Sequence, residues 1–216
     1  MAKTYQNDNS FFTVVVPQMC TYYAWPFYKW LNRKEQARFR MIQDTEIEAG
    51  RFGIQEVDDI YPGIKVVGIV MNPYARIIYK FNKILEDDQN TLSVTDRVIR
   101  NTFESRKVDP LFKKTVLELD ETGYTSLVAP SAALLPQLHW LSYTGSNGYR
   151  QADYIIRGEH ASEDIKPITD YFCLDNVDSF DLEIPEIEYR SFYTDEIKDL
   201  VSKLYEIDIK TFGYKF

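Results

Sequence analysis

Cysteine and histidine are scarce in this sequence. Its 216 residues include two cysteines, Cys20 and Cys173, and two histidines, His139 and His160. Two cysteines without a recurring spacing do not make a disulfide framework, and two histidines are too few for a histidine-based zinc site. We therefore expect no structural disulfide and no metal site, and Cys20 is expected to be a buried, inert thiol rather than a redox or nucleophilic group.

Positive charge and long apolar runs are also lacking. Lysine and arginine total 25 against 33 aspartates and glutamates, which gives a formal net charge of −8. A nucleic-acid partner needs a basic face, so none is expected. No stretch reaches the roughly 20 apolar residues of a membrane span. Residues 1–10 are polar and lack the apolar core of a signal peptide, so they are read as a tail of a soluble, cytoplasmic protein.

Apolar patterns in the rest of the chain predict alternating strands and helices. Three short runs rich in branched residues favour strands, at 11–16, 64–70 and 153–157. Helical spacing or capping residues favour helices, at 23–40, 73–86, 94–106, 109–120, 162–172 and from Thr194 onward. Residues 44–62 are predicted to be irregular because glycine and proline punctuate them. The order predicts an α/β fold, a mostly parallel central sheet of four or five strands flanked by helices on both faces, in a single domain over residues 1–216.

The most informative stretch is 66–81, VVGIVMNPYARIIYKF. It is expected to form a buried strand, a turn at Asn72-Pro73, and the start of an amphipathic helix. Proline suits the first helical position, which needs no N–H donor. A strand that runs directly into a helix N-terminus points free N–H groups at the turn, and such a turn favours an anion.

This stretch resembles the 3′-phosphate motif of the sulfotransferase family. Asn72, Pro73, Tyr74 and Arg76 match the family pattern of a strand that ends in Arg-Asn-Pro, followed by a second arginine. The resemblance implies that Asn72 and Arg76 occupy positions that bind the donor nucleotide, 3′-phosphoadenosine 5′-phosphosulfate. It also implies a fold similar to that of sulfotransferases and nucleotide kinases.

Two positions of the same motif depart from the family. Met71 stands where the family has its first arginine, and Tyr79 stands where it has a serine. The resemblance assigns both family residues to the 3′-phosphate. The frame of this half-site is therefore kept while two of its phosphate ligands are replaced. With Met71 beside it, Arg76 is expected to form a salt bridge or to lie on the helix surface.

The first strand runs into a second altered motif. The family has Pro-Lys-x-x-Gly-Thr-Ser there, which holds the 5′-phosphosulfate. Pro17 matches, but Gln18 replaces the lysine, Thr21 replaces the glycine, and Tyr22 and Tyr23 replace the hydroxyl pair. Glutamine brings no charge to an anionic transition state, threonine takes positive φ only at a cost, and two tyrosine rings fill space that a phosphate needs.

The later part of the chain resembles the carbohydrate-directed branch of the family. The similarity covers Pro136–Leu141, Ala152–His160 and the segment from Tyr193 to Tyr214, in the family's order. His139 as a general base and Glu159 as a catalytic carboxylate stay open as alternatives to structural roles. No catalytic residue is assigned.

These motifs predict a sulfotransferase-like protein that has lost catalysis, needs no cofactor, and works through protein partners. It would serve as a structural or binding component of a homo-oligomer or larger assembly, and a phage virion, at its neck or tail, is one such setting. The alternative is an active transferase that moves a sulfuryl group from 3′-phosphoadenosine 5′-phosphosulfate to a carbohydrate hydroxyl. A third reading is a lectin-like module that keeps a carbohydrate groove without the donor site.

Overall fold

The computed structural model describes eight stretches of the chain, residues 2–6, 11–16, 40–45, 54–60, 62–86, 135–145, 148–171 and 188–216. The chain divides into two compact units. The first comprises Met1–Met71 and Gln137–Glu186, and the second comprises Asn72–Pro136 and Ile187–Phe216. The prediction of one domain over residues 1–216 stays a prediction.

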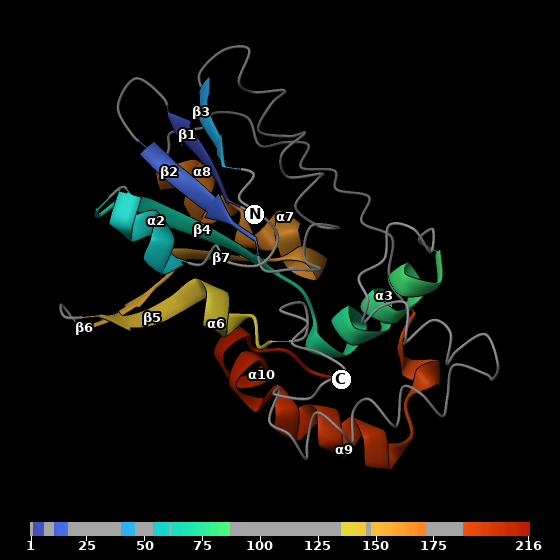
Figure 1. Ribbon diagram of the computed structural model, residues 1–216. Helices are drawn as coiled ribbons and strands as arrows, with labels where there is room; N and C mark the ends of the chain where they lie inside the picture. The colour runs from blue at the N-terminus through green and yellow to red at the C-terminus, as the bar shows by residue number, and fades with distance from the viewer. Residues whose placement is uncertain are drawn as a thin grey trace. The chain divides into compact units, whose positions relative to one another are not determined.

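The first unit contains all the described strands (Figure 1). They are β1 (Ala2–Gln6), β2 (Phe11–Val15), β3 (Arg40–Thr45), β4 (Lys65–Val70), β5 (Ser142–Gly145), β6 (Gly148–Gln151) and β7 (Tyr154–Arg157). Five form one sheet in the order β3-β1-β2-β4-β7, while β5 and β6 form an antiparallel pair. The β2–β4 and β4–β7 pairings are parallel, whereas β1 pairs antiparallel with both β2 and β3.

The prediction of an α/β fold is thus confirmed at the level of a mixed sheet with helices, and "mostly parallel" is too strong. Strands predicted at 11–16, 64–70 and 153–157 are β2, β4 and β7, the three that pair in parallel. The antiparallel part comes from β1, which ends only a few residues before β2 begins, and so short a connection joins antiparallel strands.

Two local predictions are wrong. Residues 2–6, assigned to a polar tail, form β1 and pair along their whole length with β2. The 44–62 segment, predicted to be irregular, holds the end of β3 and a helix, α2 (Ile54–Ile60). Ile54 and Val57 are both buried at a spacing of three residues, which is the apolar face that holds this short helix in place.

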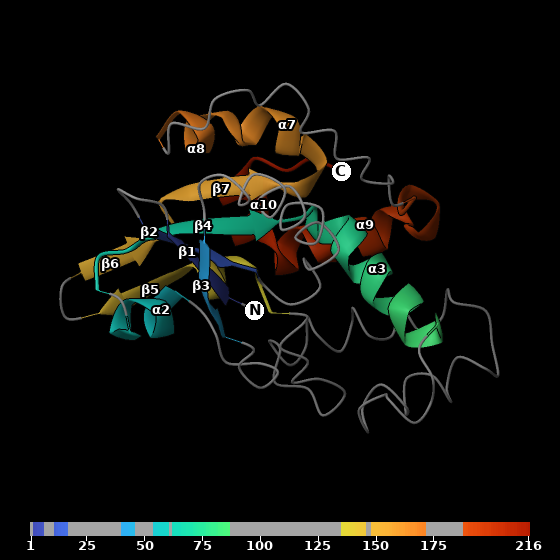
Figure 2. The same ribbon diagram turned by 90° about the horizontal axis from the view of Figure 1, so that it is seen from above.

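Helices of the first unit lie on both sides of its sheet, and in its described part α2 is joined by three further helices and a 3₁₀ turn. They are α6 (Leu138–Leu141), η2 (Gly158–His160, a 3₁₀ turn), α7 (Ala161–Asp164) and α8 (Lys166–Tyr171). Figure 2 shows α7 and α8 on one side of the sheet, and α2 with the β5–β6 pair on the other. The helix predicted at 162–172 is therefore two short helices, with a turn at Ile165 between them.

The second unit is helical in its described part. Its elements are α3 (Pro73–Glu86), η3 (Arg190–Phe192, a 3₁₀ turn), α9 (Asp195–Leu204) and α10 (Glu206–Phe212). The prediction of a helix over 73–86 is confirmed, and so is a helix that Thr194 begins. The Thr194 hydroxyl accepts a hydrogen bond from the Ile197 N–H at 3.3 Å, as an N-cap does.

Helices predicted at 94–106 and 109–120 lie outside the described residues, and so does the helix predicted at 23–40 except for Arg40, which begins β3. Within the described part of the chain, no helix combines the length and the apolar character that crossing a membrane requires.

Candidate functional site: the turn that begins α3

The predicted donor-binding positions fall into two groups. Gln18, Thr21 and Tyr22, the family-equivalent positions of the phosphosulfate loop, lie outside the described residues. Asn72, Arg76 and Tyr79 lie in the second unit, at the start and along α3. The candidate site is therefore the turn into α3, which is the 3′-phosphate half of the predicted donor site.

Asn72 is buried and holds the turn together through its side chain. Its Oδ1 accepts a hydrogen bond from the Tyr74 N–H at 3.0 Å, so that Asn72 caps the helix. Its Nδ2 donates to the Lys215 carbonyl at 3.0 Å and to the Tyr189 hydroxyl at 3.3 Å. Both the oxygen and the nitrogen of this amide, which matches the family motif, are thus hydrogen-bonded to groups of the chain itself.

Arg76 follows on the next turn of the same helix, with its N–H donating to the Asn72 carbonyl at 2.9 Å. The residue is only 1% exposed, and its guanidinium donates to the Leu135 carbonyl at 2.8 Å. It is therefore an interior residue, and the expectation of a helix-surface role is wrong.

A second buried charge accompanies Arg76. Burial raises the pKa of the Tyr205 hydroxyl, the positive charge of Arg76 acts to lower it, and the negative charge of Asp208 acts to raise it. Arg76 and Asp208 thus both lie close enough to Tyr205 to act on it electrostatically. Asp208 and Tyr205 are as deeply buried as the arginine. Two buried groups of opposite charge therefore determine the electrostatic environment of this buried hydroxyl.

An aromatic cluster covers the same turn. Tyr74, Tyr189, Tyr193 and Phe216 contact one another with ring centroids 5.0–6.4 Å apart, mostly edge to face. The Tyr193 hydroxyl donates to the Tyr74 carbonyl at 3.0 Å, and the Tyr74 and Ser202 hydroxyls share a hydrogen bond of 2.7 Å. We name Tyr74, Tyr189, Tyr193 and Phe216 the aromatic cluster.

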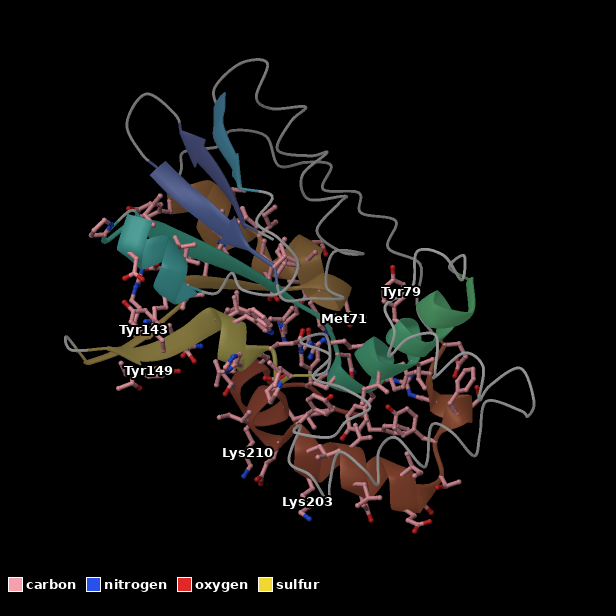
Figure 3. All side chains as sticks on the ribbon, in the orientation of Figure 1. Met71, Tyr79, Tyr143, Tyr149, Lys203 and Lys210 are labelled. Atoms are coloured by element: carbon pink, nitrogen blue, oxygen red, sulfur yellow. The ribbon has the colours of Figure 1, made fainter. Side chains whose placement is uncertain are left out.

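Tyr79, where the family has its serine, is half-buried on α3. Figure 3 shows its side chain pointing away from α9, whereas α9 supplies Ser202 to the Tyr74 hydroxyl. The structure therefore brings Asn72 and Arg76 together in one turn, and Tyr79 lies one turn further along α3, at the i+3 position from Arg76.

Met71, where the family has its arginine, ends the first of the two segments that make up the first unit and is fully buried. Its N–H donates to Gln137 Oε1 and its carbonyl accepts from Gln137 Nε2, both at 2.8 Å. Gln137 is itself fully buried, so one side-chain amide completes both hydrogen bonds that the backbone of Met71 needs beyond the end of β4.

The two open catalytic candidates lie in the first unit. His139 is exposed and sits edge-on to Trp140, with ring centroids 5.6 Å apart. Glu159 is exposed in η2. Both therefore lie in water-accessible positions of the first unit, whereas the matching residues of the donor motif lie in the second. Among the described residues, no group of three or more histidine, cysteine, aspartate or glutamate side chains could hold a metal ion.

One polar cluster of the first unit centres on Asp153, which lies within the Ala152–His160 motif but is given no role by it. Asp153, just before β7, accepts hydrogen bonds from Lys65 Nζ at 2.7 Å, from the Val66 N–H at 2.9 Å and from Arg150 at 3.2 Å. Arg150 also donates to the Ile64 carbonyl at 2.9 Å. The cluster fastens the start of β4 to the start of β7 and to β6, which explains how these short strands keep their register.

Replacing Asp153 by asparagine is expected to lower the free energy of unfolding by about 1–3 kcal/mol, since charged hydrogen bonds are lost. Burial alone would raise the pKa of Asp153, but hydrogen bonds from Lys65 and the Val66 N–H, and the charge of Arg150, outweigh it and hold the pKa below its usual value. Its contribution is present above the unfolded pKa of about 4 and is lost as the pH falls through the lower folded value. Urea unfolding between pH 2 and pH 7 should therefore show a shallower acid limb in the variant, and equal acid limbs would contradict this.

Alkaline pH is expected to destabilise the second unit. Burial, followed by the neighbouring tyrosines, raises the pKa of Tyr193 far above its usual value, and burial likewise raises that of Tyr205. Unfolded tyrosine ionises near pH 10, so above that pH the unfolded state releases protons that the folded state retains. Stability is then fully present below pH 10 and falls above it by about 1.4 kcal/mol per pH unit for each residue. Urea unfolding from pH 8 to pH 11.5 measures this, and Tyr193→Phe should flatten the decline.

The chain matches no family model, no curated protein and no solved structure. The resemblance to sulfotransferases therefore stays a prediction from the short motifs, and any proposal of function rests on the residues of the turn itself.

Proposed function

We propose that this chain is a sulfotransferase-like protein that has lost catalysis and serves as a structural or binding component of a homo-oligomer or larger assembly. The observation that supports the proposal most is the hydrogen bonding of the turn into α3. The side chains that match a phosphate-binding motif are buried and hydrogen-bonded to groups of their own chain.

A phosphate at a helix N-terminus is held by backbone N–H groups of the first turn and by nearby cations. Here the Tyr74 N–H donates to Asn72, and the cation of the motif, Arg76, donates inward to the Leu135 carbonyl. Pro73 has no N–H to offer. A phosphate would have to displace these bonds and enter beside the aromatic cluster, where a doubly charged group loses its hydration.

The composition and the exposed tyrosines of the chain support a role through protein partners. The chain is acidic and rich in tyrosine, with 16 tyrosines among its residues. Tyr149 on β6 is 62% exposed and Tyr171 at the end of α8 is 49% exposed. Tyrosine is enriched in the cores of protein–protein interfaces because it brings a large apolar ring and a polar tip together. A virion is one assembly of this kind.

The alternative, a working carbohydrate sulfotransferase, is favoured by one observation. A parallel strand, β4, is followed at once by a proline-started helix, α3, as the donor-binding frame requires. In that case Asn72 and Arg76 would bind 3′-phosphoadenosine 5′-phosphosulfate after the present contacts of the turn had opened, and the acceptor would be a carbohydrate hydroxyl.

Calorimetric titration with adenosine 3′,5′-bisphosphate decides between the two. We expect no heat of binding at millimolar nucleotide. Micromolar binding that adenosine 5′-monophosphate does not reproduce would overturn the proposal, because only a working half-site distinguishes the two nucleotides by the 3′-phosphate.

Light scattering after size exclusion tests the assembly, and a monomer at all concentrations would contradict a homo-oligomer.

A further inference from the structure

The last residues of the chain fold back onto the turn into α3. Gly213 ends α10 in the left-handed conformation, with φ of 71°, which glycine adopts without strain. The Tyr214 N–H then donates to the Ile209 carbonyl at 3.1 Å, and the Tyr214 side chain is buried. These contacts aim the residues that follow toward Asn72.

Three kinds of contact fasten this segment. The Lys215 carbonyl accepts a hydrogen bond from Asn72 Nδ2 at 3.0 Å. The Phe216 ring lies edge-on against Tyr74, Tyr193 and Tyr189, with centroids 5.0, 5.3 and 5.7 Å away. Lys198 of α9 places its ammonium 4.8 Å from the centre of the same ring, a cation–π contact.

Asn72 links this segment to the helix. One side-chain amide caps α3 through Oδ1 and holds Lys215 through Nδ2, so the position of the amide serves both contacts at once. If the Lys215 carbonyl leaves, Nδ2 loses the shorter of its two hydrogen bonds, and the amide is held less firmly in its capping position. The two events are then coupled through a single side chain.

We propose that residues 213–216 form a strap that closes the first turn of α3, and that strap and turn open together as one local unit. Local opening of this kind occurs where a few contacts tie a surface segment to the body of a domain. Any ligand or partner that reaches the turn would have to displace the strap first. The strap goes beyond the proposed function and does not depend on the chain being inactive.

Hydrogen exchange of backbone amides in the full chain tests the strap. Phe216→Ala removes three ring contacts, and we expect the amides of residues 72, 74–76 and 214–216 to exchange about tenfold faster or more, by the same factor. Phe216→Tyr keeps the ring and should restore slow exchange. Ile207→Ala on the exposed face of α10 removes a comparable apolar side chain outside the strap and should leave both segments unchanged.

Faster exchange at 214–216 alone would overturn the coupling. An equal increase throughout α9 would also overturn the inference, since the opening would then be that of the whole unit. Exchange involves no nucleotide, so either result leaves the proposed loss of catalysis untouched, and nucleotide binding would leave the strap untouched.

Discussion

Asp208→Asn is expected to lower the free energy of unfolding by about 3–5 kcal/mol, a large effect for a single substitution. Asp208 is 0% exposed and Arg76 is 1% exposed, and both act on the hydroxyl of Tyr205. Asparagine has nearly the shape of aspartate, so packing is kept while the negative charge is removed. The buried groups that interact with the Asp208 carboxylate are then left without its charge, and removing one partner of a buried charged interaction costs about this much. Urea unfolding followed by circular dichroism measures it.

A matched control separates the buried charge from charge in general. Asp199→Asn makes the same change on the exposed side of α9 and should stay within about 0.5 kcal/mol of the unchanged protein. The double variant Arg76→Met with Asp208→Leu tests whether the two buried charges compensate each other. It removes both and should be more stable than Asp208→Asn alone, since apolar replacement of two compensating buried charges is often neutral. A double variant that is less stable than the single one would rule out electrostatic compensation as the cause.

Gln137→Leu is expected to cost about 2–5 kcal/mol in the first unit, since each unsatisfied buried backbone group costs about 1–3 kcal/mol. Leucine fills a similar volume, but the Met71 N–H and carbonyl both lose the side-chain amide that bonds them, in a position closed to water. Urea unfolding provides the measurement, and exchange of the Met71 amide should rise at the same time.

Gln55→Leu is the control for this second prediction, because it introduces the same leucine at an exposed position of α2 in the same unit. Its effect should be within about 0.5 kcal/mol. If Gln137→Leu were equally mild, the two hydrogen bonds to Met71 would carry little of the stability at the end of β4.

Short-range patterns are enough to predict the strand–turn–helix that forms the candidate site. The sequence predicts β4, the turn at Asn72-Pro73 and α3 with nearly their observed bounds, because a buried β-branched run and a proline at the first helical position are local signals. Thr194 is likewise predictable as a cap from its own neighbours. The alternation of strands and helices is enough to predict the α/β class. The antiparallel strand β1 is not predictable in this way, because its residues are mostly polar and lack an apolar strand pattern.

The contacts that determine what the turn can do cannot be predicted in this way. Gln137 meets Met71 across 66 residues, and Asn72 meets Lys215 across 143. No periodicity in a single sequence marks such pairs, since both partners look like ordinary positions. The resemblance to the sulfotransferase motif predicts altered phosphate ligands at 71 and 79, but the burial of Arg76 and the contacts that surround Asn72 follow only from the three-dimensional structure.

The complete burial of Met71 has a consequence for the mutational paths open to this chain. An arginine there, as in the sulfotransferase motif, would place a guanidinium among apolar atoms, at a cost of several kcal/mol. Domains of this size have only about 5–15 kcal/mol to lose. Selection for anion binding in the laboratory would therefore have to change the surroundings of position 71 before the position itself. The single substitution Met71→Arg is therefore expected to be too destabilising to be selected. Folded proteins from variant libraries in which only residue 71 is randomised should all have an apolar residue at this position.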